Sequence, residues 1–191
     1  MIKKRLHIGV LVATLALTAG GLSSYTLSRN GYFPAATVNG DWISYREVKE
    51  NADVSRRIWA QGLAGSGDDL DILFKRGSEG ELFRRSLENL IVNSIIRSSV
   101  TAEVLRKAQK EVDNNFNGST AANLSGVVKN VYNWDPAKFK TRILEPQALM
   151  QVLAEEKGAD FDAWLQAAEL KSKVKIWFVP FEWLEGELKN K

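Results

Sequence analysis

The sequence predicts a mostly α-helical domain with a small β element, preceded by an N-terminal signal or transmembrane helix. Apolar residues recur at intervals of three and four through most of residues 45–171, which is the period of an amphipathic helix. Asn39-Gly40 lies between two short apolar segments and predicts a tight hairpin. Residues 173–179 alternate like a half-buried strand. Because an isolated hairpin is marginally stable, we expect the N-terminal hairpin to pair with this C-terminal strand.

Length and composition favour one globular domain with an appended N-terminal segment. The chain has 191 residues, 45% of them hydrophobic and 26% charged, which is ordinary globular composition. We divide it into a signal anchor with a linker (1–34), a helical domain (35–180) and a C-terminal tail (181–191). Four of the 26 basic residues precede Pro34, which leaves 22 basic and 23 acidic residues and a net charge of −1. This near-neutral body lacks the basic surface that binds nucleic acid.

Residues 1–34 have the pattern of a targeting segment. Lys3, Lys4 and Arg5 form a positive cluster, and residues 6–28 carry no formal charge. The uncharged stretch is long enough for a spanning helix, and no clean small-residue cleavage site follows it. These features favour an uncleaved anchor over a cleaved signal peptide. The positive-inside rule then places the body outside the cytoplasm, in the periplasm or at the cell surface.

A helix is expected directly after the hairpin. Ser44 and Glu47 have the spacing of a capping box, in which each side chain bonds an amide of the first turn. One face of this helix carries Val48, Ala52, Ser55 and Trp59. We expect it to end near Gly62 and a glycine-rich loop to follow as far as Gly80. The acidic cluster at residues 68–71 does not match the spacing of an EF-hand, and we interpret it as solvated loop.

Further helices fill the chain up to the last strand. Helical patterns cover residues 81–98, 101–116, 124–132, 136–158 and 161–168. Thr101, Asp135 and Asp160 precede three of these patterns and are expected N-caps. Pro146 lies inside the fourth, where it predicts a kink because proline removes a helical hydrogen bond.

The body contains few groups suited to catalysis. His7 is the single histidine, and cysteine is absent, which excludes Ser-His, Cys-His and histidine-based metal sites from the body. No phosphate-binding glycine motif is present. The carboxylate pairs Glu155-Glu156 and Asp160/Asp162 do not face one another on a helix and are interpreted as solvated or capping residues. We therefore expect no catalytic residue, no metal ligand and no cofactor.

Six tryptophans are the remaining unusual feature. Trp59 and Trp164 fall on apolar helical faces and are expected in the core. Trp42 lies in the hairpin, Trp177 is out of phase with the apolar residues of its strand, and Trp183 lies in the tail. Exposed aromatic side chains of this kind mark binding surfaces, so these three are candidate polypeptide-binding residues. The alternative is ordinary structural packing.

Several segments together resemble a known family. The stretch Ala36-Thr37-Val38-Asn39-Gly40-Asp41-Trp42-Ile43-Ser44, followed by a capped helix, resembles the start of the N-terminal chaperone domain of SurA and PrsA-type foldases. Residues 131–140, VYNWDPAKFK, are similar to a Y-G-W-x-x-x-x-F-K segment of related exported proteins, which also precedes a helix with an internal proline. Residues 170–176 are similar to the closing strand of that domain. The likeness runs in order through residues 35–180.

The resemblance implies that the body binds unfolded or nascent exported polypeptides. Family members usually carry parvulin prolyl isomerase domains as well, whereas eleven residues follow Pro180 here and the body has no histidine. We therefore expect a membrane-anchored, non-catalytic chaperone-like protein that binds no nucleic acid. One alternative is a peptidylprolyl isomerase family foldase, either degenerate or acting with a separate parvulin partner. Another is a structural assembly subunit.

Overall fold

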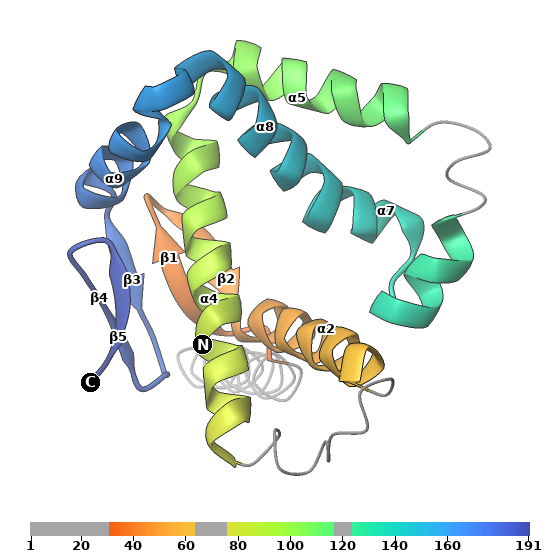
Figure 1. The fold of residues 1–191 in the computed structure, drawn as a ribbon. Coiled ribbons are helices and arrows are strands. Elements are labelled where there is room, and N and C mark those ends of the chain that lie inside the picture. Colours follow the sequence, from red (N-terminus) through yellow and green to blue (C-terminus); the bar gives the residue numbers. More distant parts are fainter. Residues whose placement is uncertain (1–30, 64–75, 117–123) are drawn as a thin grey trace, which may run out of the picture.

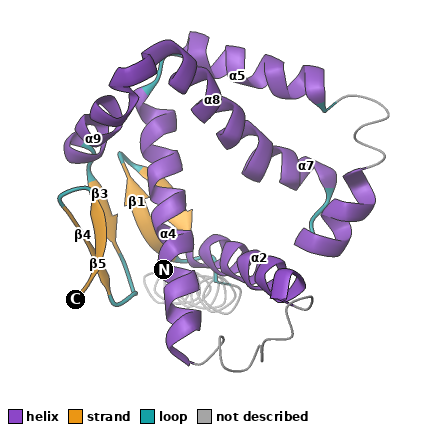
Figure 2. Cartoon of the chain, in the orientation of Figure 1, coloured by secondary structure: helices purple, strands orange, loops and turns teal. Residues whose placement is uncertain are grey.

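A computed structural model of the chain describes residues 31–63, 76–116 and 124–191. These residues are mostly helical and carry two small antiparallel sheets (Figures 1 and 2). The α-helices are α2 (Tyr45–Leu63), α4 (Arg76–Ser99), α5 (Ala102–Asn115), α7 (Pro136–Phe139), α8 (Glu145–Lys157) and α9 (Phe161–Lys171). Two π-helical segments, η1 (Val128–Tyr132) and η2 (Lys140–Leu144), and the 3₁₀ turn η3 (Gly158–Asp160) connect them. The strands are β1 (Pro34–Val38), β2 (Asp41–Ser44), β3 (Val174–Ile176), β4 (Phe181–Leu184) and β5 (Glu187–Asn190). The mostly α fold with a small β element is confirmed.

The hairpin and its C-terminal partner strand form a three-stranded sheet in the order β2-β1-β3. Asn39 and Gly40 make the turn with φ values of 52° and 102°, the positive values that a tight hairpin turn requires. β3 pairs antiparallel with β1, with Thr37 opposite Lys175. The prediction that the two ends of the domain meet in one sheet is confirmed. β3 ends at Ile176, earlier than expected, because Phe178 has a left-handed φ of 49° that takes the chain out of the strand.

Asn39 also joins the hairpin turn to two other parts of the chain. Its backbone N–H donates to the Lys173 carbonyl at 3.0 Å, and its Oδ1 accepts from the Lys173 N–H at 2.9 Å. Its Nδ2 donates to Ser98 Oγ at 2.9 Å and to Ser172 Oγ at 3.3 Å. One turn residue therefore ties β1 to the end of α4 and to the segment that leads into β3.

Helix α2 begins as expected, with one difference at its cap. Ser44 Oγ accepts from the Glu47 N–H at 3.2 Å, which confirms the first half of the capping box. The Glu47 carboxylate lies 2.5 Å from Arg142 Nη1, so it joins α2 to η2. Trp59 is 50% exposed, and its prediction as a core residue is wrong, because the described residues that bury Val48 and Ala52 on the same face leave Trp59 half uncovered.

Helix α4 starts at Arg76, earlier than the expected Glu81, and covers one face of the sheet (Figure 1). The described residues form three hydrophobic clusters, and α4 contributes to two of them. The first packs α4 against the sheet and the C-terminal strands, the second joins its end to α5 and α8, and the third joins α2 to the segment around Trp134. Almost fully buried residues in these clusters include Leu87, Ile91 and Ile95 in the first, Ile96, Val152 and Leu153 in the second, and Val128 in the third.

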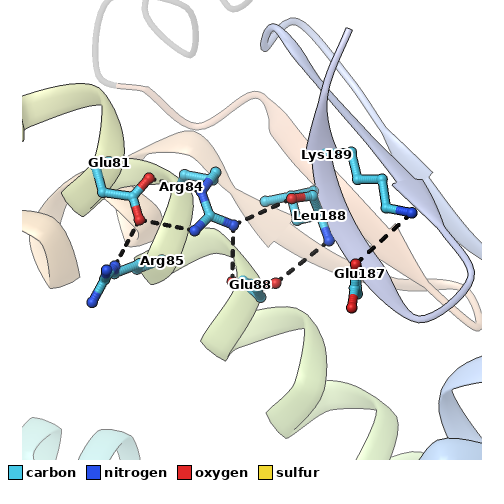
Figure 3. Close-up of polar contacts among 7 residues, drawn as sticks. All are labelled: Glu81, Arg84, Arg85, Glu88, Glu187, Leu188 and Lys189. Carbon is cyan, nitrogen blue, oxygen red and sulfur yellow. Dashed lines mark hydrogen bonds and ion pairs between the residues drawn. The ribbon is translucent and has the colours of Figure 1, made fainter. Parts of the chain in front are cut away.

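Residues 181–191, expected as a polar tail, form the β4–β5 hairpin and belong to the core. Phe181 and Leu188 are 6% and 3% exposed and pack in the same cluster as Leu87. Figure 3 shows how α4 holds the hairpin: Arg84 Nη1 donates to the Leu188 carbonyl at 3.2 Å, and the Leu188 N–H donates to Glu88 Oε1 at 3.4 Å. The interpretation of residues 181–191 as a tail is therefore corrected. Phe181 and Leu188 cover apolar side chains of α4 that the first sheet does not cover.

The expected helix signals were mostly right. Thr101 Oγ1 accepts from the Val104 N–H at 3.4 Å, and Asp135 Oδ1 accepts from the Lys138 N–H at 2.8 Å, so both caps are confirmed. Asp160 precedes α9, but its side chain caps no amide among the described residues, and that prediction is wrong. Before Pro146 the helix widens into η2, where the Glu145 N–H bonds the Lys140 carbonyl five residues back. Proline has no backbone N–H to donate, and the wider π-helical turn before it accommodates this missing hydrogen bond.

Residues 1–30 lie outside the described part, and so do the signal anchor and its orientation. Among the described residues, no helix is long and apolar enough to cross a membrane.

Candidate functional site

An open groove of about 610 Å³ lies between α2, α4 and the helices from η1 to α8. Figure 1 shows α2, α4 and α8 around this region. Its apolar lining residues are Val54, Ile58, Val92, Tyr132, Trp134, Ile143, Pro146 and Met150. Its polar lining residues are Asn51, Ser55, Ser86, Asn89, Asn93, Arg142 and Gln147. The groove is thus a mixed surface between the second and the third hydrophobic clusters.

Ion pairs along α2 position one wall of the groove. Arg142 lies against Glu47, and Lys138 Nζ lies 2.7 Å from Glu50 Oε2. Arg57 donates to the carbonyls of Val131 and Tyr132 at 3.0 and 2.7 Å. Burial alone would raise the pKa of Glu50, but hydrogen bonds from Lys138 and from Arg46 outweigh it and hold that pKa below its usual value. The two ion pairs thus hold η2 and α7 against α2, and the Arg57 hydrogen bonds hold η1 there.

The aromatic part of the lining comes from a short turn between η1 and α7. Asn133 has a left-handed φ of 54°, which ends η1, and Asp135 caps α7 two residues later. The turn places Trp134, 5% exposed, with its ring centroid 5.6 Å from that of Tyr132. Lys138 Nζ lies 5.2 Å from the Trp134 ring, a cation–π distance. The aromatic wall is therefore fixed by packing on both sides.

The polar part of the lining consists almost entirely of amides and hydroxyls. Asn51 and Ser55 come from α2, Asn89 and Asn93 lie one turn apart on α4, and Gln147 follows Pro146 on α8. An amide side chain offers two donors and a carbonyl acceptor, which matches the groups of an extended polypeptide backbone. Arg142 is the one charged lining residue, and its guanidinium faces Glu47. The groove can thus bind uncharged polar and apolar groups side by side.

The structure separates the three tryptophans that the sequence singled out. Trp42 and Trp177 are 60% and 39% exposed and lie on the face of the first sheet that is turned away from the core. Trp183 is half-buried and packs against the first hydrophobic cluster. The three residues therefore do not form one patch.

Sequence reasoning missed the groove, although one signal could have indicated it. Asn89 and Asn93 lie four residues apart in the most apolar part of α4, where asparagine is a poor helix former. Two such residues on one face, beside Val92, indicate a polar surface next to the apolar face of this helix. The contribution of α2 and α8 depends on how the helices cross, which spacing alone does not give.

The described residues offer few candidates for bond chemistry. They contain no group of three His, Cys, Asp or Glu side chains arranged to hold a metal ion. Glu155, Glu156, Asp160 and Asp162 are all exposed. The lining residues of the groove include no carboxylate, imidazole, thiol or amine.

No protein-family model, no curated protein and no solved structure matches this chain. The resemblance to the N-terminal domain of SurA and PrsA-type foldases stays a prediction.

Proposed function

We propose that this protein is a membrane-anchored, extracytoplasmic, chaperone-like protein that binds unfolded or nascent exported polypeptides without catalysis. One observation carries the proposal: the open groove combines apolar side chains with amides and hydroxyls and presents no free charge. A partly extended polypeptide offers apolar side chains and unpaired backbone amides together, so both halves of the lining find partners. Tyr, Trp and Met are enriched at protein-binding surfaces, and a flexible Met side chain adapts to varied sequences.

The anchor follows from the sequence of residues 1–34. The cluster Lys3-Lys4-Arg5 and the uncharged residues 6–28 fit a single span with the body outside the cytoplasm. Clients would then be exported chains close to the membrane. Binding would be weak and tolerant of sequence, because association entropy offsets much of what one groove gains.

The test measures suppression of aggregation by the full chain in detergent micelles. Insulin that aggregates when its disulfides are reduced is a suitable client, because this chain has no cysteine and does not react with the reductant. Ile58→Glu puts a charge at a 42% exposed groove residue, and Leu170→Glu does the same at a 62% exposed residue of α9. We expect Ile58→Glu to raise the half-suppressing concentration at least fivefold, a loss of about 1 kcal/mol, and Leu170→Glu to leave it unchanged.

Three results would contradict the proposal or the site that it assigns. The chaperone function is wrong if wild-type protein fails to slow aggregation at large molar excess. The non-catalytic part is wrong if purified protein accelerates prolyl isomerisation of a short peptide and an independent preparation, freed of contaminating isomerases, retains that activity. Equal effects of Ile58→Glu and Leu170→Glu would remove the groove as the binding site.

A further inference from the structure

The first sheet has an outer face with aromatic and basic side chains. Alternation along β1 buries Ala36 and Val38 and turns Thr37 to the other side, where it lies opposite Trp42 on β2 and Lys175 on β3. Trp177 Nε1 donates to Thr37 Oγ1 at 3.4 Å, so its indole lies over the same strand. We define the outer sheet face by its side chains: Thr37, Trp42, Lys173, Lys175 and Trp177.

Two further exposed aromatic residues, Tyr32 and Phe178, lie outside the outer sheet face. Phe178 follows Trp177 directly and is 77% exposed. Its ring makes an edge contact with Phe33, with the centroids 6.0 Å apart. Tyr32 is 45% exposed, and its ring lies 5.0 Å from the Arg46 guanidinium carbon. Phe33 itself is partly buried and stacks on Tyr45, with the centroids 4.9 Å apart, and Tyr45 packs against the first hydrophobic cluster.

Only a short length of chain separates Tyr32, at the start of the described residues, from the uncharged segment. Residues 6–28 carry no formal charge, and four peptide units separate Ser28 from Tyr32. A fully extended chain covers at most about 3.6 Å per residue, or about 14 Å over this distance. The headgroup layer on each side of the hydrocarbon core is about 5–8 Å thick. If residues 6–28 span a bilayer, Tyr32 lies in or just above that layer.

The charges of the outer sheet face are positive. Lys173 and Lys175 are exposed, and Lys171 is exposed in the last turn of α9, just before them. The side chains that define the face include no carboxylate. Lysines beside a membrane are attracted to anionic lipid headgroups, and Trp and Tyr concentrate at the headgroup level because their rings are amphipathic. A surface of this composition, this close to a span, matches an anionic membrane surface.

We propose that the outer sheet face lies on the anionic headgroups of the membrane that holds residues 6–28, with Trp42 and Trp177 at the interface. This inference rests on the anchor in the proposed function, but not on polypeptide binding. α4 and the first hydrophobic cluster cover the opposite face of the sheet (Figure 1), so the outer sheet face can contact a membrane without any change in the core. The groove, built from α2, α4 and α8, does not share residues with this surface and stays available.

The test uses the full chain reconstituted into phosphatidylcholine vesicles with and without 30% phosphatidylglycerol. Because the chain has no cysteine, one introduced cysteine carries a single environment-sensitive fluorophore. Thr37→Cys reports the outer sheet face, and Asn114→Cys reports an exposed position on α5. We expect lipids with a headgroup-level quencher to quench the label at position 37 at least twofold more than the label at position 114 in anionic vesicles. Flotation of the same vesicles measures the anchor separately.

Charge reversal provides the matched control. In the Thr37→Cys chain, Lys173→Glu with Lys175→Glu should remove most of the extra quenching, whereas Lys107→Glu with Lys110→Glu on α5 should not. Equal quenching at positions 37 and 114 in floated vesicles would overturn docking and leave the anchor intact. A chain that fails to float would overturn the anchor and the docking together. A third result would replace the lipid with a polypeptide as the ligand of this face. In that case the extra quenching is unchanged by Lys173→Glu with Lys175→Glu and is abolished by adding an unfolded client.

Discussion

Replacing Asn39, which joins β1 to α4 and to the segment before β3, is expected to lower the free energy of unfolding by an amount that depends on the new residue. Asn39 has a φ of 52°, and its side chain makes three hydrogen bonds, to Ser98, Lys173 and Ser172. In Asn39→Gly the new glycine adopts this φ without strain, but all three side-chain hydrogen bonds are lost. Asn39→Ala removes the same bonds and adds the strain of a left-handed Cβ.

The magnitudes follow from these contacts. Hydrogen bonds that are open to solvent fall at the low end of the usual range, about 0.5 kcal/mol each. Three such bonds, together with the greater freedom of glycine in the unfolded chain, give a loss of about 1.5–2.5 kcal/mol in the free energy of unfolding for Asn39→Gly. Asn39→Ala should be less stable than Asn39→Gly by about 1 kcal/mol.

Urea unfolding of the full chain in non-ionic detergent, followed by tryptophan fluorescence, measures these differences. Lys110 is a control position, because it is exposed in the interior of α5. Inside a helix alanine is more stable than glycine by about 1 kcal/mol, so the order of the alanine and glycine substitutions should reverse between positions 110 and 39. Asn39→Gly with wild-type stability would refute the role of the side-chain bonds. Asn39→Ala at least as stable as Asn39→Gly would refute the left-handed turn.

Three further predictions concern the two ends of the chain and α4. Deleting residues 173–191 should abolish the near-UV dichroism of the body, because it removes β3 and the buried Phe181 and Leu188; an unchanged spectrum and melting temperature would contradict the closure of the sheet. Hydrogen bonds from Arg84 and then Arg85 lower the pKa of Glu81 from 4.5 to about 2. The ionised Glu81 carboxylate therefore stabilises the fold fully above pH 4.5, and this stabilisation is lost as the pH falls towards 2. Glu81→Gln should lower the melting temperature at pH 7 but not at pH 2. Glu156→Gln, at an exposed position, should change the melting temperature at neither pH. N-terminal sequencing of the mature protein should find Met1 or Ile2, and a new terminus between Ala19 and Arg29 would replace the anchor with a cleaved signal.

The sequence by itself determined the local elements of this protein. Asn39-Gly40 makes a hairpin wherever it lies between short strands, because both residues accept a positive φ. Thr101 and Asp135 cap helices through contacts three residues away. The pairing of β1 with β3 was also predictable, because the sequence contained one other clear strand candidate and a hairpin needs a partner.

Only the tertiary structure decided which side chains meet across helices. Trp59 lies on an apolar stripe but is exposed, because the residues that the structure describes leave half of its side chain uncovered. Residues 181–191 are polar in composition, yet Leu188 is buried because its side chain packs in the same cluster as Leu87 and Ile91 of α4. The groove brings Asn51, Asn93 and Trp134 together from α2, α4 and the turn after η1. Periodicity gives the buried face of one helix, but the angle at which two helices cross depends on the packing of all their side chains, so a site between helices is decided by that packing.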